Sequence, residues 1–233
     1  IFDSLELLRA QRKVKSALLR QIVLDFRHCF YHWPVHPAEQ RYLATRLGNE
    51  WLVWLRATQG SRGAPLISGR GIALAMRLAT SVVPLDQMRS STYVDDPIMS
   101  FAGTDATNNR NIAKVVLALR ALNLSLAYDK AQDSKYEPVI TWTSARFRTL
   151  GREGVEVTVK EEIVADVTDD IADISKFNRV KIKAVRQLAG RANCIASLIH
   201  PWRPFVSMLW APIYDSRAHC ADQPSHMWVK ALA

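Results

Sequence analysis

The feature that most constrains the fold is a pair of adjacent acids, Asp95 and Asp96, between two strand-like segments within residues 88–101. Strands on both sides of the pair place the two acids in the turn of a hairpin. A third acid, Asp25, lies near the end of the apolar, branched segment 18–26, as it would at the tip of a buried strand. Three carboxylates at strand tips can meet only in a sheet that brings those tips to one edge.

The rest of the chain alternates strand and helix signals in an order typical of α+β proteins. The predicted strands are 18–26, 42–47, 50–55, 88–93, 98–101, 139–150 and 155–159. The predicted helices are 64–83, 104–122 and 161 to about 210, with breaks at Pro201 and Pro204. The expected class is therefore α+β, an antiparallel sheet with two helices on one face, followed by a helical region.

The composition suits a polyanionic partner. The 233 residues include 31 Lys and Arg against 22 Asp and Glu, a net charge of +9, although basic surfaces also occur on proteins that bind nothing acidic. The cysteines Cys29, Cys194 and Cys220 are far apart and odd in number, which indicates neither a disulfide framework nor a zinc site. No apolar run is long enough to span a bilayer, so no membrane association is expected. The chain starts at Ile1 in mid-pattern and reads as a piece of a longer protein.

The segment Tyr93-Val94-Asp95-Asp96, with Asp25 upstream, resembles reverse transcriptases, whose hallmark is Tyr-x-Asp-Asp paired with a strand-borne Asp. The alternative is a solvated turn that happens to contain two acids. The resemblance covers about residues 18–214 and implies a polymerase palm, a helical thumb and truncated fingers. The implied domains are a palm with a remnant of the fingers at 1–160, a thumb at 161–215 and the start of a connection at 216–233. It also implies that Asp25, Asp95 and Asp96 hold two Mg²⁺ ions about 4 Å apart, with Mn²⁺ as a substitute.

Other segments resemble the family in the same order along the chain. Phe30 falls where the family has an aromatic gate that leaves no room for a 2′-hydroxyl, and Gln59-Gly60 opens a segment similar to Gln-Gly-x-x-x-x-Pro. Lys130 ends a segment whose Lys approaches the triphosphate, as a proton donor or charge stabiliser. The implied nucleotide-binding residues are Phe26, Phe30, Gln59, Gly60 and Tyr93. Without the resemblance, a core position would be the favoured interpretation of Phe30, and Lys130 could almost equally be a solvated surface residue.

Residues 185–193 resemble the thumb helix of retroviral and retrotransposon enzymes. The resemblance implies that Gly190 lets the helix approach primer-template closely, while Arg186 and Arg191 meet phosphates. The basic residues within 176–183 add charge nearby. Outside this context such a charge run is usually a solvated face.

The implied function is RNA-directed and DNA-directed DNA polymerisation, in which a nucleotidyltransferase adds dNTPs to the 3′ end of a primer on an RNA or DNA template. Two alternatives remain. One is a catalytically inactive polymerase relic that binds primer-template, and the other is an RNA-dependent RNA polymerase palm, which the bulky Phe30 disfavours. The expected source is a retrotransposon polyprotein whose other parts are fingers, RNase H and an integrase or recombinase. An intracellular location, in a cytoplasmic particle or the nucleus, is expected.

Overall fold

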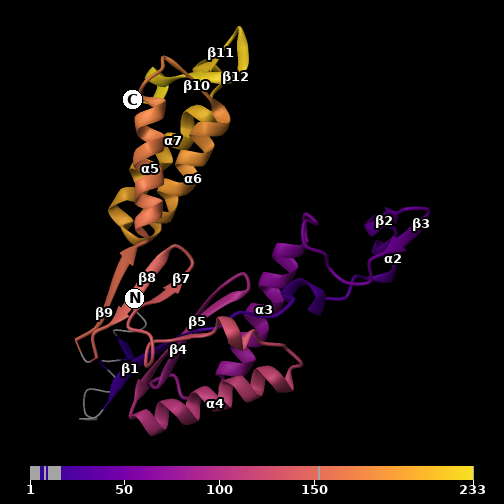
Figure 1. Ribbon diagram of the computed structural model, residues 1–233, viewed down its shortest axis with the longest axis vertical. Coiled ribbons are helices and arrows are strands. Elements are labelled where there is room, and N and C mark those ends of the chain that lie inside the picture. Colours follow the sequence, from indigo (N-terminus) through magenta and orange to yellow (C-terminus); the bar gives the residue numbers. More distant parts are fainter. Residues whose placement is uncertain (1–5, 8, 10–16, 152, 233) are drawn as a thin grey trace. The chain divides into compact units, whose positions relative to one another are not determined.

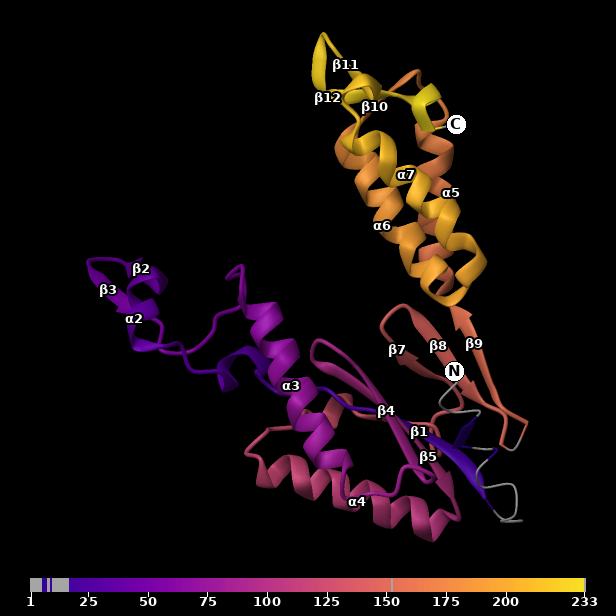
Figure 2. The ribbon, with the colours of Figure 1, turned by 180° about the vertical axis from the view of Figure 1, so that it is seen from behind.

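In the computed structural model of the chain, residues 6, 7, 9, 17–151 and 153–232 are described. The chain divides into two compact units, shown from opposite sides in Figures 1 and 2. The first unit comprises Ile1–Thr143 and Phe147–Val157, and the second comprises Ser144–Arg146 and Thr158–Ala233. Within the described residues, no helix combines the length and apolar character needed to cross a membrane.

The first unit is built on a four-stranded antiparallel sheet of order β4-β5-β1-β6. Its strands are β1 (Leu18–Val23), β4 (Met88–Tyr93), β5 (Asp96–Gly103) and β6 (Gln132–Asp133). Helices α3 (Ala64–Thr80) and α4 (Asp105–Ala121) pack on one face of this sheet (Figure 2). The α+β class expected from the sequence is confirmed. Thr104 caps the start of α4, because its side chain accepts a hydrogen bond from the Thr107 amide.

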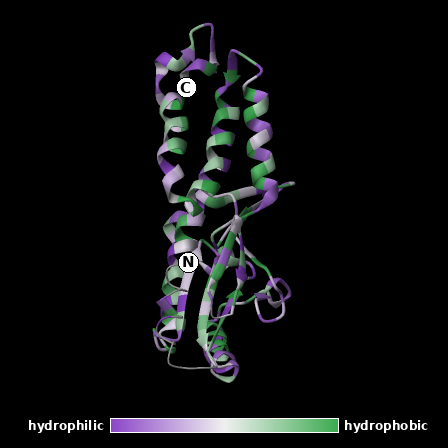
Figure 3. Ribbon diagram, turned by 90° about the vertical axis from the view of Figure 1, so that its left-hand side faces the viewer, coloured by the Kyte–Doolittle hydropathy of each residue, from purple (hydrophilic) through white to green (hydrophobic). Residues whose placement is uncertain are grey.

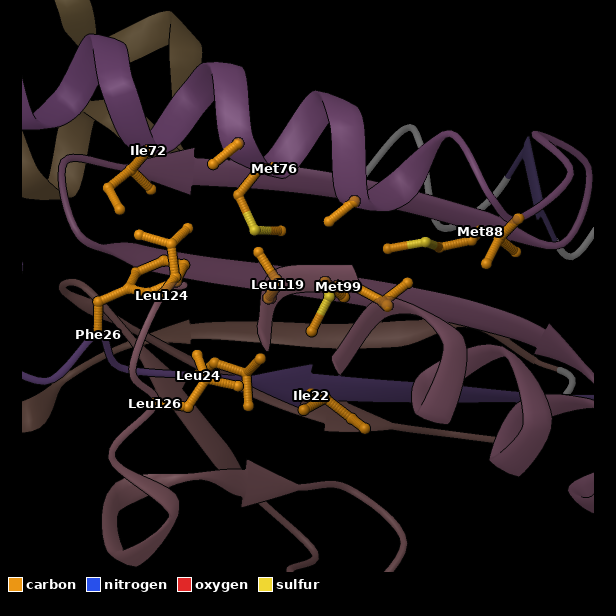
Figure 4. Packing of buried hydrophobic residues seen from close by; sticks show 14 of the residues in the cluster. Ile22, Leu24, Phe26, Ile72, Met76, Met88, Met99, Leu119, Leu124 and Leu126 are labelled. Atoms are coloured by element: carbon orange, nitrogen blue, oxygen red, sulfur yellow. The ribbon is translucent and has the colours of Figure 1, made fainter. Parts of the chain in front are cut away.

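The core of the first unit lies between this sheet and the two helices (Figure 4). Met99 of β5, Ile72 of α3 and Leu119 of α4 have essentially no exposed surface, and Ile22 of β1 is 5% exposed. Burial of a side chain of this size stabilises the fold by about 1.5–3 kcal/mol. Phe26 also belongs to this cluster, at 2% exposure. The core therefore fixes the strands that lead to the acidic residues.

A second hairpin in the first unit is formed by the strand segments predicted at 42–47 and 50–55, and it turns at Gly48, which has a φ of +61°. The remaining elements of the unit are short. They are α2 (Pro37–Gln40), β2 (Ala44–Leu47), β3 (Glu50–Val53) and the 3₁₀ helices η1 (Cys29–His32), η2 (Arg41–Leu43) and η3 (Tyr128–Lys130). A further sheet, of order β7-β8-β9, consists of β7 (Ile140–Trp142), β8 (Ala145–Thr149) and β9 (Val155–Val159), and the division between the two units falls within β8 and β9. The single strand predicted at 139–150 is wrong, because Thr143 adopts a φ of +52° and separates β7 from β8.

The second unit contains three helices and a small sheet of order β10-β12-β11. The helices are α5 (Glu161–Ile174), α6 (Ile182–Leu198) and α7 (Arg203–Tyr214), and the strands are β10 (Arg179–Lys181), β11 (His219–Cys220) and β12 (Gln223–Trp228). Short 3₁₀ helices are η4 (His200–Trp202), η5 (Ser216–Ala218) and η6 (Val229–Leu232). Figure 3 shows hydrophobic residues recurring along the helices, and Val185, Leu188, Ile213 and Met227 form the centre of their core.

Two features of the second unit differ from the sequence expectations. The helical pattern predicted from residue 161 to about 210 is interrupted by β10. Residues 219–228, expected to begin a connection, instead form β11 and β12, and β12 pairs with β10. Met227 of β12 is fully buried, so this segment contributes to the core of the second unit. The predicted break occurs at Pro201, between the end of α6 and the start of α7, whereas Pro204 lies in the first turn of α7, where proline is compatible with a helix.

Candidate functional site

The acidic hairpin joins β4 to β5 through a two-residue turn. Tyr93 pairs with Asp96 at the last rung of the ladder, and Val94 and Asp95 form the turn itself. Val94 has a φ of +54°, a conformation that costs a β-branched residue about 1–3 kcal/mol. The close approach of α3 accompanies this strained turn, since a Cβ on Gly69 would lie 3.8 Å from the Cα of Val94. Such strain in a tight turn persists only where the surrounding structure over-determines it.

Asp25 lies just beyond the end of β1, beside the start of β5. The amide of Leu24 donates to the carbonyl of Pro97 at 3.1 Å, and the carbonyl of Asp25 accepts from the amide of Ala127 at 2.9 Å. These backbone bonds hold Asp25 between the segment that follows Asp96 and the segment that leads to β6. The structure thus brings together the strand ends that carry the three acids singled out in the sequence.

The electrostatics of this region reflect the proximity of the acids. Burial, followed by the charges of Asp95 and then Asp25, raises the pKa of Asp96 above its usual value. Burial and then the same carboxylates, Asp95 first, raise the pKa of the Cys29 thiol to about 11. The described residues nevertheless contain no group of three or more His, Cys, Asp or Glu side chains arranged to hold a metal ion. The acids therefore lie near one another without surrounding one metal position.

Lys130 supplies the positive charge at this cluster. Its Nζ lies 2.6 Å from Oδ2 of Asp25, and the hydrogen bond to Asp25 raises the pKa of the lysine above its usual value. The Lys130 side chain is 66% exposed, whereas that of Asp25 is 22% exposed. The charge on Lys130 also partly offsets the effects that raise the pKa of Asp96. Lys130 thus neutralises part of the charge that the carboxylates share.

The residues expected to face the nucleotide occupy different environments. Phe30 is half-buried in η1, and Tyr93 is 62% exposed. Gln59 and Gly60 are exposed in the loop before α3, where Gly60 has a φ of +93°. The Phe26 ring is buried in the core, and its backbone forms a bridge with Leu126. The Phe26 ring therefore anchors the segment next to Asp25 in the core, and it is not exposed to a ligand.

The thumb-like residues lie on α6 in the second unit. Arg186 and Gly190 are exposed, and a Cβ built on Gly190 would meet nothing within 4 Å. Arg191 is instead held by α5, with an ion pair of 2.7 Å to Asp170 and a longer one of 3.4 Å to Asp166. The hydrogen bond to Asp170 raises the pKa of Arg191. The charge of Arg191 is thus partly neutralised by the two aspartates of α5.

No role was predicted for Trp142, although its side chain reaches the acidic hairpin. The Nε1 of Trp142 donates a hydrogen bond of 2.8 Å to the backbone carbonyl of Asp96. This bond ties β7 to the start of β5 and fixes the backbone that carries one of the acids. The residues next to Trp142 in the sequence do not indicate which way its side chain points. They therefore could not predict a contact with a residue as distant in the sequence as Asp96.

Comparison with known proteins identifies the fold. No protein-family model matches the chain, and no curated protein matches it in sequence. Among solved structures, the foamy viral protease-reverse transcriptase in complex with an RNA/DNA hybrid matches with a TM-score of 0.52 and 15% identity, over 81% of this chain and 24% of that one. A second foamy viral protease-reverse transcriptase structure, in complex with double-stranded DNA, matches with a TM-score of 0.53 and 17% identity, over 81% of this chain and 31% of that one. The chain therefore has a reverse-transcriptase-like fold and spans less than a third of the length of these proteins.

Proposed function

We propose that this chain is the polymerase core of a reverse-transcriptase-like enzyme, which adds deoxynucleotides to a primer 3′ end on an RNA or DNA template. One observation carries the proposal. Asp25, Asp95 and Asp96 influence one another at one edge of an antiparallel sheet, within a fold similar to that of a reverse transcriptase. In this proposal the first unit acts as the palm and the second as the thumb, with the chain derived from a retrotransposon polyprotein inside the cell.

The acidic residues have the chemistry that Mg²⁺ requires, because carboxylate oxygens are its preferred protein ligands. Asp25, Asp95 and Asp96 are the residues that would hold it. When bound, the metal would supply Lewis-acid stabilisation of the charge that develops on phosphate and on the primer hydroxyl. The raised pKa of Asp96 fits this role, since burial and then the like charges of Asp95 and Asp25 disfavour its ionisation, and a bound cation would offset both effects.

Two side chains of this chain support the acids directly. The Trp142 indole holds the carbonyl of Asp96 and so orients the acidic turn. The Lys130 ammonium carries a proton beside Asp25, where it can neutralise phosphate charge or donate to a leaving group. Lys130 is largely exposed, so it can reach a bound ligand without disturbing the core.

Discrimination between sugars is proposed for Phe30, which lies in η1 shortly after Asp25 and is half-buried. A flat ring beneath the incoming sugar leaves no volume for a 2′-hydroxyl. Phe30→Ala should therefore admit ribonucleotides while the affinity for primer-template stays nearly constant. Incorporation of each nucleotide type is measured by single-nucleotide extension, and equal discrimination in the variant and the parent would make Phe30 a core residue only. Loss of discrimination would also argue against an RNA-dependent RNA polymerase.

Nucleic-acid binding is proposed for the second unit. The two matched foamy viral structures contain an RNA/DNA hybrid and double-stranded DNA, respectively. In this chain, Gly190 of α6 faces open space and Arg186 is exposed beside it on the same helix. A helix with a bare backbone position can approach a duplex closely, and an exposed guanidinium can contact phosphate. The rival proposal is a catalytically inactive relic that binds primer-template.

Primer extension separates these two functions. The full chain is given a labelled primer on RNA and DNA templates, with deoxynucleotides and a titration of Mg²⁺ or Mn²⁺. Asp95→Asn should abolish extension and leave duplex binding intact, whereas the matched exposed variant Asp169→Asn on α5 should extend normally. If the parent chain binds duplex but never extends it at any metal concentration, the relic is the correct description.

A further inference from the structure

The sheet of the second unit presents one face that combines basic and aromatic side chains. In the antiparallel ladder, Val180 pairs with Met227, and both side chains are buried in the core. Because side chains alternate along a strand, the flanking pairs Arg179 with Trp228 and Lys181 with His226 point to the opposite face. Lys230, just after β12, lies over the Trp228 ring. We call this set the basic strand face: Arg179, Lys181, His226, Trp228 and Lys230.

Two cations of the basic strand face are held in place by its tryptophan. The Arg179 guanidinium carbon lies 4.5 Å from the centre of the Trp228 ring, and the Lys230 ammonium lies 5.6 Å from it. Arg179 also forms an ion pair of 2.6 Å with Asp222, in the turn between β11 and β12. A guanidinium that is already ordered loses less freedom when it binds an anion. The Trp228 ring thus restricts the positions of the Arg179 and Lys230 side chains, and it does not neutralise their charges.

The charges of this face are only partly neutralised within the unit. Asp222 compensates Arg179, whereas Lys181 and Lys230 form no ion pair with any other described residue. Arg179, Lys181 and Lys230 are exposed, and no large aliphatic side chain stands among them. Such a surface is unsuited to an apolar protein partner, which would bury these charges unpaired. It suits a partner with regularly spaced anionic groups.

We propose that the basic strand face binds the phosphate backbone of nucleic acid without reading its sequence. The ligand class follows from the chemistry: the Arg179 guanidinium and the Lys230 ammonium, both ordered by Trp228, and the further ammonium of Lys181 match phosphodiester groups, each of which carries one negative charge and accepts hydrogen bonds through its oxygens. No base is stacked, because the Trp228 ring already contacts two cations. The site goes beyond the proposed polymerase function, since it lies on β10 and β12, requires neither the acidic hairpin nor the exposed face of α6, and would operate in an inactive relic as well.

The test is a salt titration of duplex binding by the full chain. Lys181→Glu with Lys230→Glu removes two phosphate contacts, and each contact contributes about 0.9 to the slope of log affinity against log salt for B-form DNA. The slope should therefore fall by about 1.8. Between about 50 and 200 mM salt, the double variant should then lose about 12-fold less affinity than the parent. The effect should be the same for duplexes of unrelated sequence.

A matched control separates a site from a change in net charge. Arg110→Glu with Lys114→Glu alters two exposed cations on α4 by the same total charge and should leave the slope close to that of the parent. The neutral pair Lys181→Gln with Lys230→Gln guards against misfolding and should lower the slope in the same direction. Equal slopes for the two charge-reversal pairs overturn the proposal, and so does equally tight binding of the parent to anionic lipid vesicles. Primer extension by the same variants reports independently on the polymerase function, so that each proposal can fail alone.

Discussion

The ion pair between Arg20 of β1 and Asp133 of β6 gives the sharpest prediction about the stability of the four-stranded sheet of the first unit. Arg20 is only 8% exposed. Its Nε donates to Asp133 at 2.8 Å, a second nitrogen donates to the other carboxylate oxygen, and a third donates to Asn109 at 2.5 Å. The hydrogen bond with Asp133 raises the pKa of Arg20 above its usual value, so the guanidinium stays charged wherever the fold exists.

Removing either partner should have unequal effects. Asp133→Ala leaves a nearly buried guanidinium with only the more distant carboxylate of Asp105, at 3.7 Å, and removes two charge-assisted hydrogen bonds, which should cost about 3–5 kcal/mol. Arg20→Met should cost less, about 1–3 kcal/mol, because a carboxylate that water can reach recovers part of the lost interaction. The Asp133 side chain is 21% exposed and also accepts from the amide of Lys135 at 2.9 Å. With both residues apolar, no buried charge remains, so the coupling energy should be about 2–3 kcal/mol.

Hydrogen exchange of peptides that cover β1 is the appropriate assay, because the chain has two compact units and a global unfolding curve would mix them. Asp133→Ala should raise exchange across Leu18–Val23, and the double variant should recover much of the protection. Lys135→Met, which breaks an exposed pair with Asp105, serves as the control and should leave this protection unchanged. If Asp133→Ala and Lys135→Met have the same effect on β1, the pair does not stabilise the sheet and the reasoning is refuted.

Three further predictions concern the proposed site. Gly190→Ala should raise the free energy of unfolding by about 0.5–1 kcal/mol, because alanine favours the helix and its Cβ meets open space, yet it should weaken duplex binding measured by anisotropy; unchanged binding would remove α6 from the interface. Asp96→Asn should stabilise the chain against urea in the presence of a chelator, because it removes a partly buried charge that lies beside Asp95 and Asp25. A loss of stability would contradict burial and like charge as the causes of the raised pKa of Asp96. Lys130→Gln should tighten Mn²⁺ binding measured by calorimetry, because it frees Asp25 from its ammonium partner, whereas Lys114→Gln should not; equal affinities would show that Lys130 and metal do not compete.

Local patterns in the sequence were sufficient for the features that short-range physics determines. The hairpin around Asp95 and Asp96 follows from residues within a few positions of one another and occurs at the predicted place, although Asp96 begins β5 and only Asp95 lies in the two-residue turn. Pairings between distant segments were missed. The β10–β12 ladder, the hydrogen bond from Trp142 to Asp96 and the ion pair from Arg191 to Asp170 each join residues whose own neighbours give no indication of a partner. A tertiary contact of this kind depends on the whole chain path, and residue type alone does not specify it.

Contacts between distant segments also connect the stability of the four-stranded sheet with the chemistry proposed at its edge. In the antiparallel pairing of β1 with β6, Ile22 lies opposite Asp133, and Arg20 on the same strand bonds to that aspartate. Three residues before Asp133, Lys130 reaches across to Asp25, which lies beyond the end of β1. The Arg20–Asp133 and Lys130–Asp25 ion pairs therefore lie on either side of the short β1–β6 ladder. The Arg20–Asp133 pair stabilises the register of that ladder, and the Lys130–Asp25 contact depends on this register. A change at Asp133 should consequently alter the Lys130–Asp25 contact, although Asp133 itself touches neither residue through a hydrogen bond or ion pair within the described chain.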